Sequence, residues 1–237
     1  MDILFERIID ILTVFVGVLG LLGNIVALIG FQKQCKKTST TLLFKALSLA
    51  DLFVITTVMC YLLSILLIRN IISWRQSAGL FVAMEISVLA STGITVLMAV
   101  SRLVAVVFPL QASRHCSVVK MYLYLVVAIM FAICYNIPRI LYLFEITIIP
   151  WSTMADYRPV VYCVIPMGII TSITVILIIK LSYLNKRRAQ MTRSQQQRNT
   201  TTRLLIAVLF LFIVCSIPLP VFFINLSYKP NVQNLGL

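Results

Sequence analysis

The chain has 237 residues, of which 61% are hydrophobic and 11% are charged, and its formal net charge is +13. A soluble globular domain cannot hide so much apolar surface, so the composition excludes that class. Lipid allows only helices or closed barrels to cross it, and a barrel would show short alternating segments. The long continuous apolar runs therefore predict an all-α transmembrane helix bundle.

The apolar runs predict six spans within a single domain that covers residues 1–237. Each run reaches the roughly 20 residues that a helix needs to cross the hydrocarbon core. The N-terminus lacks the basic segment of a signal peptide, so the first run is expected to be retained as a span. The predicted spans cover residues about 8–31, 42–68, 78–107, 120–143, 159–183 and 200–226.

Lysine and arginine are distributed unevenly between the two ends of these spans. Positive residues collect in cytoplasmic loops, so the distribution predicts a plasma-membrane protein with its N-terminus outside. The basic excess serves this topology and anionic membrane lipids, and it requires no nucleic acid. Fourteen of the 20 basic residues lie at the predicted inner end: Lys33, Lys36, Lys37, Lys45, Arg102, Arg114, Lys120, Lys180, Lys186, Arg187, Arg188, Arg193, Arg198 and Arg203.

Asp51 lies in the middle of the second predicted span. A carboxylate at this depth is costly and normally faces the bundle interior with a partner. Asn24 and Ser91 lie at similar depths in the first and third spans. We predict a polar cluster of these three residues, which either holds a cation or a proton or serves as a structural hydrogen-bond network.

Glu85 precedes Arg102 by 17 residues, or about 25 Å along a helix, so the two lie near opposite membrane faces. Glu85 is then close to the outer face. Three interpretations stay open: it contacts a cationic ligand group, it pairs with Arg139, or it faces water. Arg102, taken alone, is explained by a side chain that reaches lipid headgroups.

Cysteine and proline occur repeatedly within the predicted spans. Most of the cysteines are expected to be small buried hydrophobic residues. Proline removes a backbone hydrogen bond and kinks a helix, and four prolines interrupt spans: Pro138, Pro166, Pro218 and Pro220.

No catalytic constellation is present in the sequence. The single histidine, His115, lies in a predicted loop, and the carboxylates of Asp51 and Glu85 do not form a paired site. The protein is therefore not expected to be an enzyme.

Several short motifs occur in an order typical of one membrane family. They are Gly23–Asn24, the LSLAD of residues 47–51, Ser101-Arg102-Leu103 followed by VVFPLQA, Pro166, and the CSIP of residues 215–218. In this order and spacing the chain resembles the rhodopsin-like (class A) G-protein-coupled receptors. The stretch YNIPRILYLFE at 135–145 further resembles the end of helix four in invertebrate FMRFamide-type neuropeptide receptors.

The resemblance implies a receptor that passes the signal of an extracellular peptide to a heterotrimeric G protein. It implies a ligand site at Glu85, Met84 and Arg139, and a weakly bound sodium ion at Asp51, Asn24 and Ser91. It also implies a kink of helix six at Pro218, and G-protein contacts at Arg102, Leu110 and the segment 184–203.

The sequence also departs from the family pattern. Ser101 replaces the acidic residue before Arg102, Ser216 replaces a tryptophan, and Ser77 stands where the family has a disulfide-forming cysteine. Met84 replaces the aspartate of amine receptors, which argues against a monoamine ligand. The seventh helix is expected to be absent from this chain, so weak G-protein coupling is expected.

Two alternatives to a signalling receptor stay open. The chain could be a non-signalling receptor fragment, or a transporter or channel that uses Asp51 and Glu85. The sequence shows no repeated halves, which disfavours the transporter.

Overall fold

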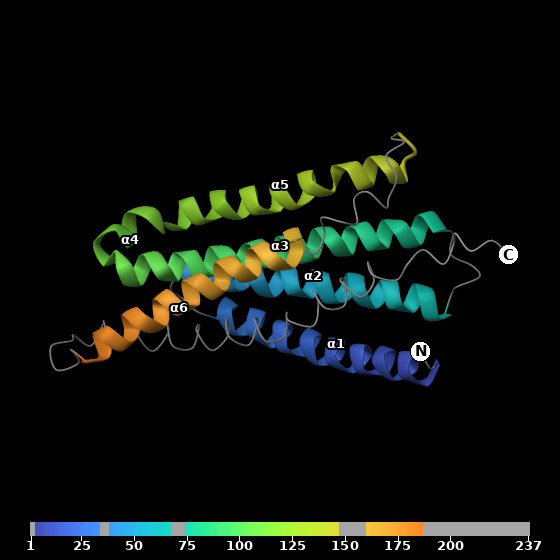
Figure 1. Ribbon diagram of the computed structural model, residues 1–237, viewed down its shortest axis with the longest axis horizontal. Helices are drawn as coiled ribbons and strands as arrows, with labels where there is room; N and C mark the ends of the chain where they lie inside the picture. The colour runs from blue at the N-terminus through green and yellow to red at the C-terminus, as the bar shows by residue number, and fades with distance from the viewer. Residues whose placement is uncertain (1–2, 34–37, 68–73, 147–159, 187–237) are drawn as a thin grey trace. The chain divides into compact units, whose positions relative to one another are not determined.

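The computed structural model describes residues 3–33, 38–67, 74–146 and 160–186, and every element within these ranges is a helix (Figure 1). This confirms the all-α prediction. The elements are α1 (Ile3–Gln32), α2 (Ser39–Leu67), α3 (Trp74–Val107), α4 (Pro109–His115), α5 (Val118–Leu143), the π-helical turn η2 (Val160–Val164) and α6 (Ile165–Lys186).

Five helices in the described ranges are long and apolar enough to cross a membrane. They coincide with the first five predicted spans. The predicted sixth span, 200–226, lies outside the described residues together with Pro218. The membrane-crossing segments are Ile11–Gln32, Ser39–Leu63, Ala78–Val107, Val118–Leu143 and Val160–Lys180.

The chain divides into two compact units. Among the described residues, the first unit holds α1, α2, α3 as far as Leu97, and α5. The second unit holds the end of α3 from Met98, α4, η2 and α6. Asp51 and Glu85 both belong to the first unit.

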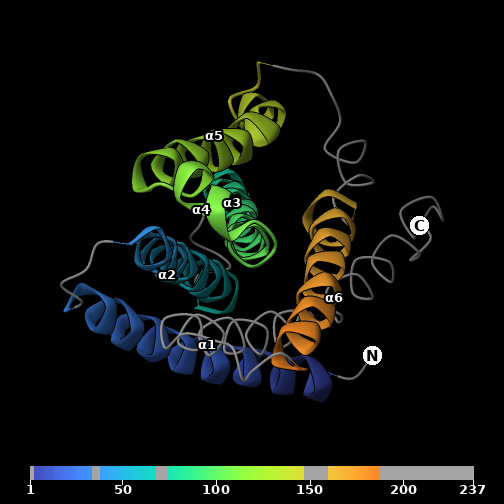
Figure 2. The same cartoon turned by 90° about the vertical axis from the view of Figure 1, so that its left-hand side faces the viewer.

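Helices α1 and α2 lie side by side in the first unit (Figure 2). Two glycines of α1 allow this approach. A Cβ atom added at Gly17 would overlap the Met59 methyl group, and one added at Gly20 would lie 2.8 Å from Ile55 Cδ1. Because side chains of α2 occupy this space, the α1 glycines set the position of the helix that carries Asp51.

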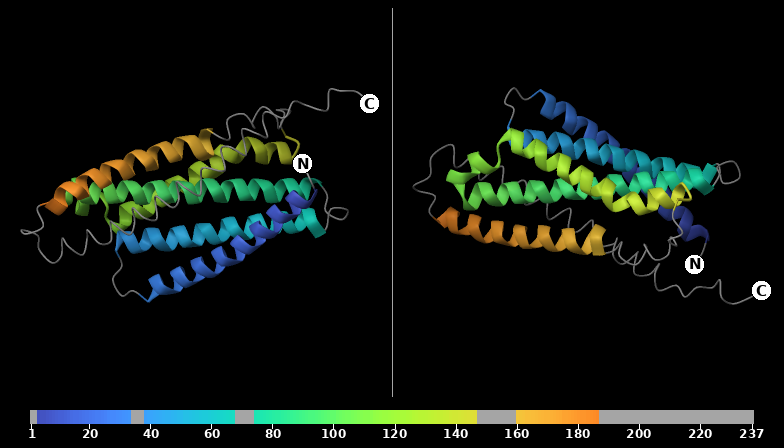
Figure 3. Two further views of the ribbon diagram at one scale, coloured as in Figure 1. Left: turned by 60° about the horizontal axis from the view of Figure 1, so that its bottom comes forward. Right: turned by 90° about the horizontal axis from the view of Figure 1, so that it is seen from above.

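Helix α5 runs back along α3 in the opposite direction (Figure 3). A Cβ atom at Gly93 of α3 would lie 3.5 Å from Ala128 of α5, and one at Gly79 would lie 3.8 Å from Leu143. The small residues allow the two backbones to approach, as in other membrane helix pairs. Glu85 lies between Gly79 and Gly93, so this packing places it beside the last turns of α5.

The outward faces of these helices are strongly apolar. Helix α1 has no buried residue within its membrane-crossing window, and α5 exposes large residues such as Phe131 and Tyr122. Such faces suit lipid. Cys60 and Cys134 are exposed, so the prediction that most cysteines are buried is wrong for these two. A thiol is apolar enough to lie on a lipid-facing surface.

The second unit contains a helix that the sequence does not predict. Helix α4 has only seven residues, with proline in its first turn and Arg114 and His115 in its last. These residues favour a helix start and end, but seven residues are too few to show a helical period. Pro166 is the second residue of α6 and follows the π-helical turn η2 directly, so it lies inside one continuous helical run that starts at Val160.

Candidate functional site

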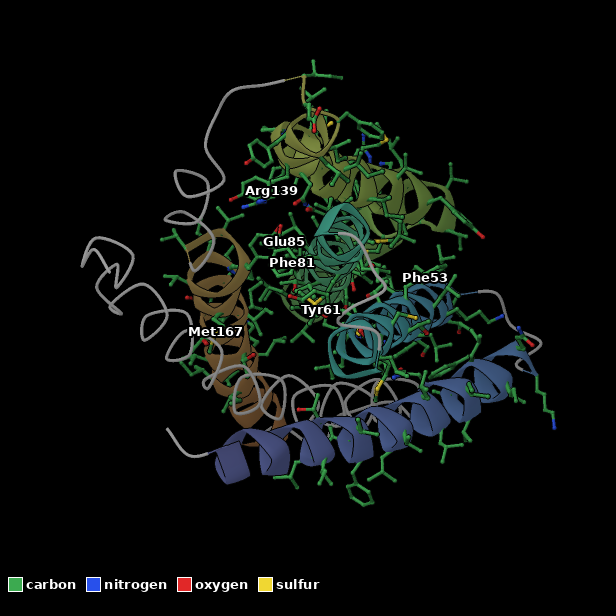
Figure 4. All side chains as sticks on the ribbon, turned by 90° about the vertical axis from the view of Figure 1, so that its right-hand side faces the viewer. Phe53, Tyr61, Phe81, Glu85, Arg139 and Met167 are labelled. Carbon is green, nitrogen blue, oxygen red and sulfur yellow. The ribbon has the colours of Figure 1, made fainter. Side chains whose placement is uncertain are left out.

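A buried ion pair joins α3 to α5 in the first unit. Arg139 Nε lies 3.2 Å from Glu85 Oε2, and the two side chains are 3% and 7% exposed. Figure 4 shows both residues in the space between the two helices. Of the three interpretations of Glu85, the structure shows pairing with Arg139, and the burial excludes a side chain that faces water. The ligand-binding role is a separate question.

Helix α5 itself orients the Arg139 guanidinium. Its Nη1 donates to Asn136 Oδ1 at 2.9 Å, and its Cζ lies 5.6 Å from the Tyr135 ring centroid. Asn136 is fully buried, and its Nδ2 donates to the Ala132 carbonyl at 2.9 Å. Residues three and four positions apart share a helix face. The spacing of Tyr135, Asn136 and Arg139 could therefore have predicted this arrangement, but the sequence analysis assigned no role to the first two.

An aromatic pair lies one helical turn before Glu85. Phe81 on α3 and Tyr61 on α2 have ring centroids 5.7 Å apart in a tilted arrangement, and both are labelled near Glu85 in Figure 4. Residues four apart on a helix are neighbours, so Phe81 lies on the same side of α3 as Glu85, and Tyr61 packs against Phe81. Met84 is half-buried. As the residue directly before Glu85, it points about 100° away around the helix.

Asp51 has a hydroxyl partner in the middle of the first unit. Ser91 Oγ on α3 donates to Asp51 Oδ1 on α2 at 2.5 Å. The structure therefore brings together two of the three residues that the sequence analysis grouped. Asn24 Nδ2 donates to the Gly20 carbonyl at 3.0 Å, within its own helix. The amide of Asn24 is therefore engaged along α1.

The end of α3 and the residue after α4 form a small cluster in the second unit. Ser101 is buried and its Oγ donates to the Met98 carbonyl at 2.8 Å, while Cys116 Sγ lies 3.9 Å from the Ser101 carbonyl. Burial raises the pKa of the Cys116 thiol, and the positive charge of Arg102 opposes this rise in part. Leu110 lies in the first turn of α4, and its side chain is outside the described residues.

The described part of the chain has no group of three or more histidine, cysteine or acidic residues that could hold a metal ion. Within its membrane-crossing helices, the first unit has one buried ion pair, Glu85–Arg139, and one carboxylate with a hydrogen-bonded hydroxyl partner, Asp51. The fold and these groups define a multi-pass α-helical membrane protein with polar side chains between its helices at two positions, one at Asp51 and one at Glu85.

The family model described as "7 transmembrane receptor (rhodopsin family)" matches residues 23–235. The chain belongs to this rhodopsin family of receptors, which confirms the family resemblance that the motifs indicate.

A curated relative, the FMRFamide receptor of Drosophila melanogaster, is 24% identical over 257 aligned residues. The alignment covers 93% of this chain and 44% of that receptor. The chain therefore spans less than half the length of this relative.

Proposed function

We propose that the protein is a receptor that binds a neuropeptide on its outer side and activates a heterotrimeric G protein on its inner side. The N-terminus is outside and the protein lies in the plasma membrane. The observation that carries this proposal is the Glu85–Arg139 pair beside the Tyr61–Phe81 rings, together with the family match. Helix α3 begins at Trp74, so Glu85 lies about 16 Å from its outer end.

The ligand site consists of Glu85, Arg139 and Met84, bordered by the two rings. A peptide can meet charged, polar and aromatic groups there. The relative's name contains that of an amidated peptide, and its one-letter code spells Phe-Met-Arg-Phe-amide. We use this peptide as the probe because the likeness to the relative extends over most of the chain.

The G-protein face comprises Arg102, Leu110 and the basic segment 184–203. Ser101 donates to the backbone of its own helix. It therefore cannot restrain Arg102 with a negative charge as an acidic residue would, and the loss of one such partly exposed pair is worth about 0–1 kcal/mol. This supports slightly raised basal activity. We propose that the sixth predicted span, residues 200–226, moves about Pro218 and that this movement completes the switch.

We also propose that Asp51, with Ser91 and Asn24, binds sodium weakly. The three side chains offer carboxylate, hydroxyl and amide oxygens, the donor type that hard cations prefer. The Ser91–Asp51 hydrogen bond places two of these donors together. A bound sodium ion would supply a positive charge that compensates the Asp51 carboxylate.

The test is binding of fluorescent Phe-Met-Arg-Phe-amide to membranes that contain the full chain, followed by G-protein nucleotide exchange. Glu85→Ala should weaken binding by about 10- to 100-fold, because it leaves Arg139 without its anion. Glu145→Gln is the matched control, since Glu145 is an exposed carboxylate beyond the end of α5. Unchanged affinity in Glu85→Ala, at equal expression, would contradict the proposed site.

A further inference from the structure

A proline separates the end of α5 from the rest of that helix. Pro138 lies inside α5, and it supplies no N–H for the Cys134 carbonyl four residues earlier. Sharp bends of helices occur at such positions, because the ladder of backbone hydrogen bonds is interrupted there. Residues 139–146, called here the terminal segment, can therefore change direction more readily than the end of an uninterrupted helix.

The terminal segment is closed by hydrogen bonds of its own. The Phe144 N–H donates to the Ile140 carbonyl at 3.2 Å, and the Ile146 N–H donates to the Leu141 carbonyl at 3.0 Å. Glu145, with a φ of 61°, forms the turn between them. Because these bonds join residues of the segment to one another, a change of direction at the proline leaves them intact and the segment moves as one body.

One buried side chain anchors the terminal segment to α3. Within residues 139–146, all of which the structure describes, Arg139 is the only buried residue. Its Nε lies 3.2 Å from Glu85 Oε2 on α3. Leu143 is half-buried, and a Cβ atom added at Gly79 of α3 would lie 3.8 Å from it. The ion pair is thus the buried contact that holds the segment against α3.

We propose that the terminal segment is a hinged latch, which turns about Pro138 and is held closed by the Glu85–Arg139 ion pair. The part of α5 before the proline stays in place, because Ala128 packs closely against Gly93 of α3. The hinge itself depends on no ligand. One consequence rests on the proposed function: the side chains of the pair are 3% and 7% exposed, so a ligand reaches them when the latch opens.

Distances between spin labels on the full chain in lipid nanodiscs test the latch. The test pair joins Leu63 of α2 to Phe144 of the terminal segment. The reference pair joins Leu49 of α2 to Val119 near the start of α5. All four side chains are exposed, and unnatural amino acids carry the labels, so the native cysteines are kept. A bend of about 20° at Pro138 would shift the label about 9 Å further along the helix by about 3 Å.

The sharpest variant moves the negative charge from α3 to α5. In Glu85→Leu combined with Asn136→Asp, Arg139 keeps an anionic partner, because Asn136 Oδ1 already accepts from Arg139 Nη1 at 2.9 Å. The buried charges still balance, but no ion pair joins α5 to α3. The distance distribution of the test pair should shift or broaden by about 3 Å, and that of the reference pair should stay as in the wild type.

A second variant covers the case in which the first does not fold. The double variant E85Q/R139M has neither the ion pair nor a buried charge at these positions, and it should open the latch in the same way. Glu145→Gln is the matched control, because it removes an exposed carboxylate from the same segment and leaves the ion pair in place. Its two distance distributions should equal those of the wild type.

Adding Pro138→Ala to either ion-pair variant tests the position of the hinge. Alanine restores the missing N–H, so the backbone ladder becomes continuous. The distribution of the test pair should then narrow to the wild-type width, with or without a shift of its mean. The reference pair should again stay unchanged.

The outcomes separate the latch from the proposed function. A wild-type distribution of the test pair in both ion-pair variants would overturn the latch, because the segment would be held without the pair. A broad distribution that persists after Pro138→Ala would overturn it as well, and so would equal changes in the test and reference pairs. Each of these results leaves the peptide receptor standing, whereas failure of the wild type to bind Phe-Met-Arg-Phe-amide would contradict that function and leave the latch.

Discussion

The two carboxylates inside the first unit are balanced in different ways. Glu85 has a guanidinium partner at 3.2 Å that is itself held by Asn136. Asp51 has a hydroxyl partner, Ser91. A hydroxyl hydrogen bond supplies no compensating charge, whereas a guanidinium does. The charge of Glu85 is therefore balanced within a neutral pair, whereas Ser91 brings Asp51 a hydrogen bond but no charge.

The largest expected loss of stability comes from breaking the Glu85–Arg139 ion pair. Arg139→Met removes the cation and leaves the Glu85 carboxylate buried, which typically costs about 3–5 kcal/mol. The thermal stability of the purified protein in detergent measures this loss. The double variant E85Q/R139M should recover most of it, since it leaves no buried charge. A single variant as stable as the wild type would show that the pair is not desolvated in the membrane protein.

A smaller loss of stability should follow when the packing of α1 against α2, the helix that carries Asp51, is disturbed. Gly17→Leu forces a side chain into the space that Met59 occupies, and overpacking of this kind costs about 1–3 kcal/mol. Gly30→Leu is the matched control on the same helix, because a Cβ atom there meets nothing within 4 Å. Thermal unfolding of both variants tests this. Equal stabilities would contradict the close α1–α2 contact.

The smallest expected effect is the dependence of stability on sodium. A sodium concentration equal to the dissociation constant would stabilise the wild type by about 0.4 kcal/mol. Asp51→Asn keeps a hydrogen-bonding side chain and removes the charge, so its stability should not respond to sodium. Melting curves in sodium and in choline chloride measure the difference. Equal sodium responses in both proteins would exclude Asp51 as the cation ligand.

The spans could be predicted from the sequence because lipid imposes a simple requirement on length and polarity. The first five predicted ranges agree with the observed helices to within a few residues, apart from the earlier start of α1 at Ile3. Helix α4 could not be predicted, since seven residues are too short for a periodic pattern. The expectation that most cysteines are buried fails for Cys60 and Cys134, because a hydropathy pattern alone does not show which helix face is turned outward.

The candidate site could be predicted only in part from the sequence. The membrane cost of a charge identified Asp51 and Glu85 as needing partners, and Arg139 was one of the options for Glu85. Which option is realised depends on the register between α3 and α5, and that register comes from contacts such as Gly93 with Ala128. Asn24 and Ser91 were likewise predicted as partners of Asp51 because they lie at a similar depth in their own spans. Depth could not show that Asn24 would donate along its own helix.

Photo-crosslinking tests the central claim, that the Glu85–Arg139 pair and its bordering rings form the ligand site. The probe is Phe-Met-Arg-Phe-amide with a benzophenone side chain in place of the terminal phenylalanine, bound to the full chain in membranes and mapped by mass spectrometry. The account predicts adducts on the parts of α2 and α3 that carry Tyr61 and Phe81, suppressed by excess unlabelled peptide. Specific binding with adducts confined to other segments would contradict it.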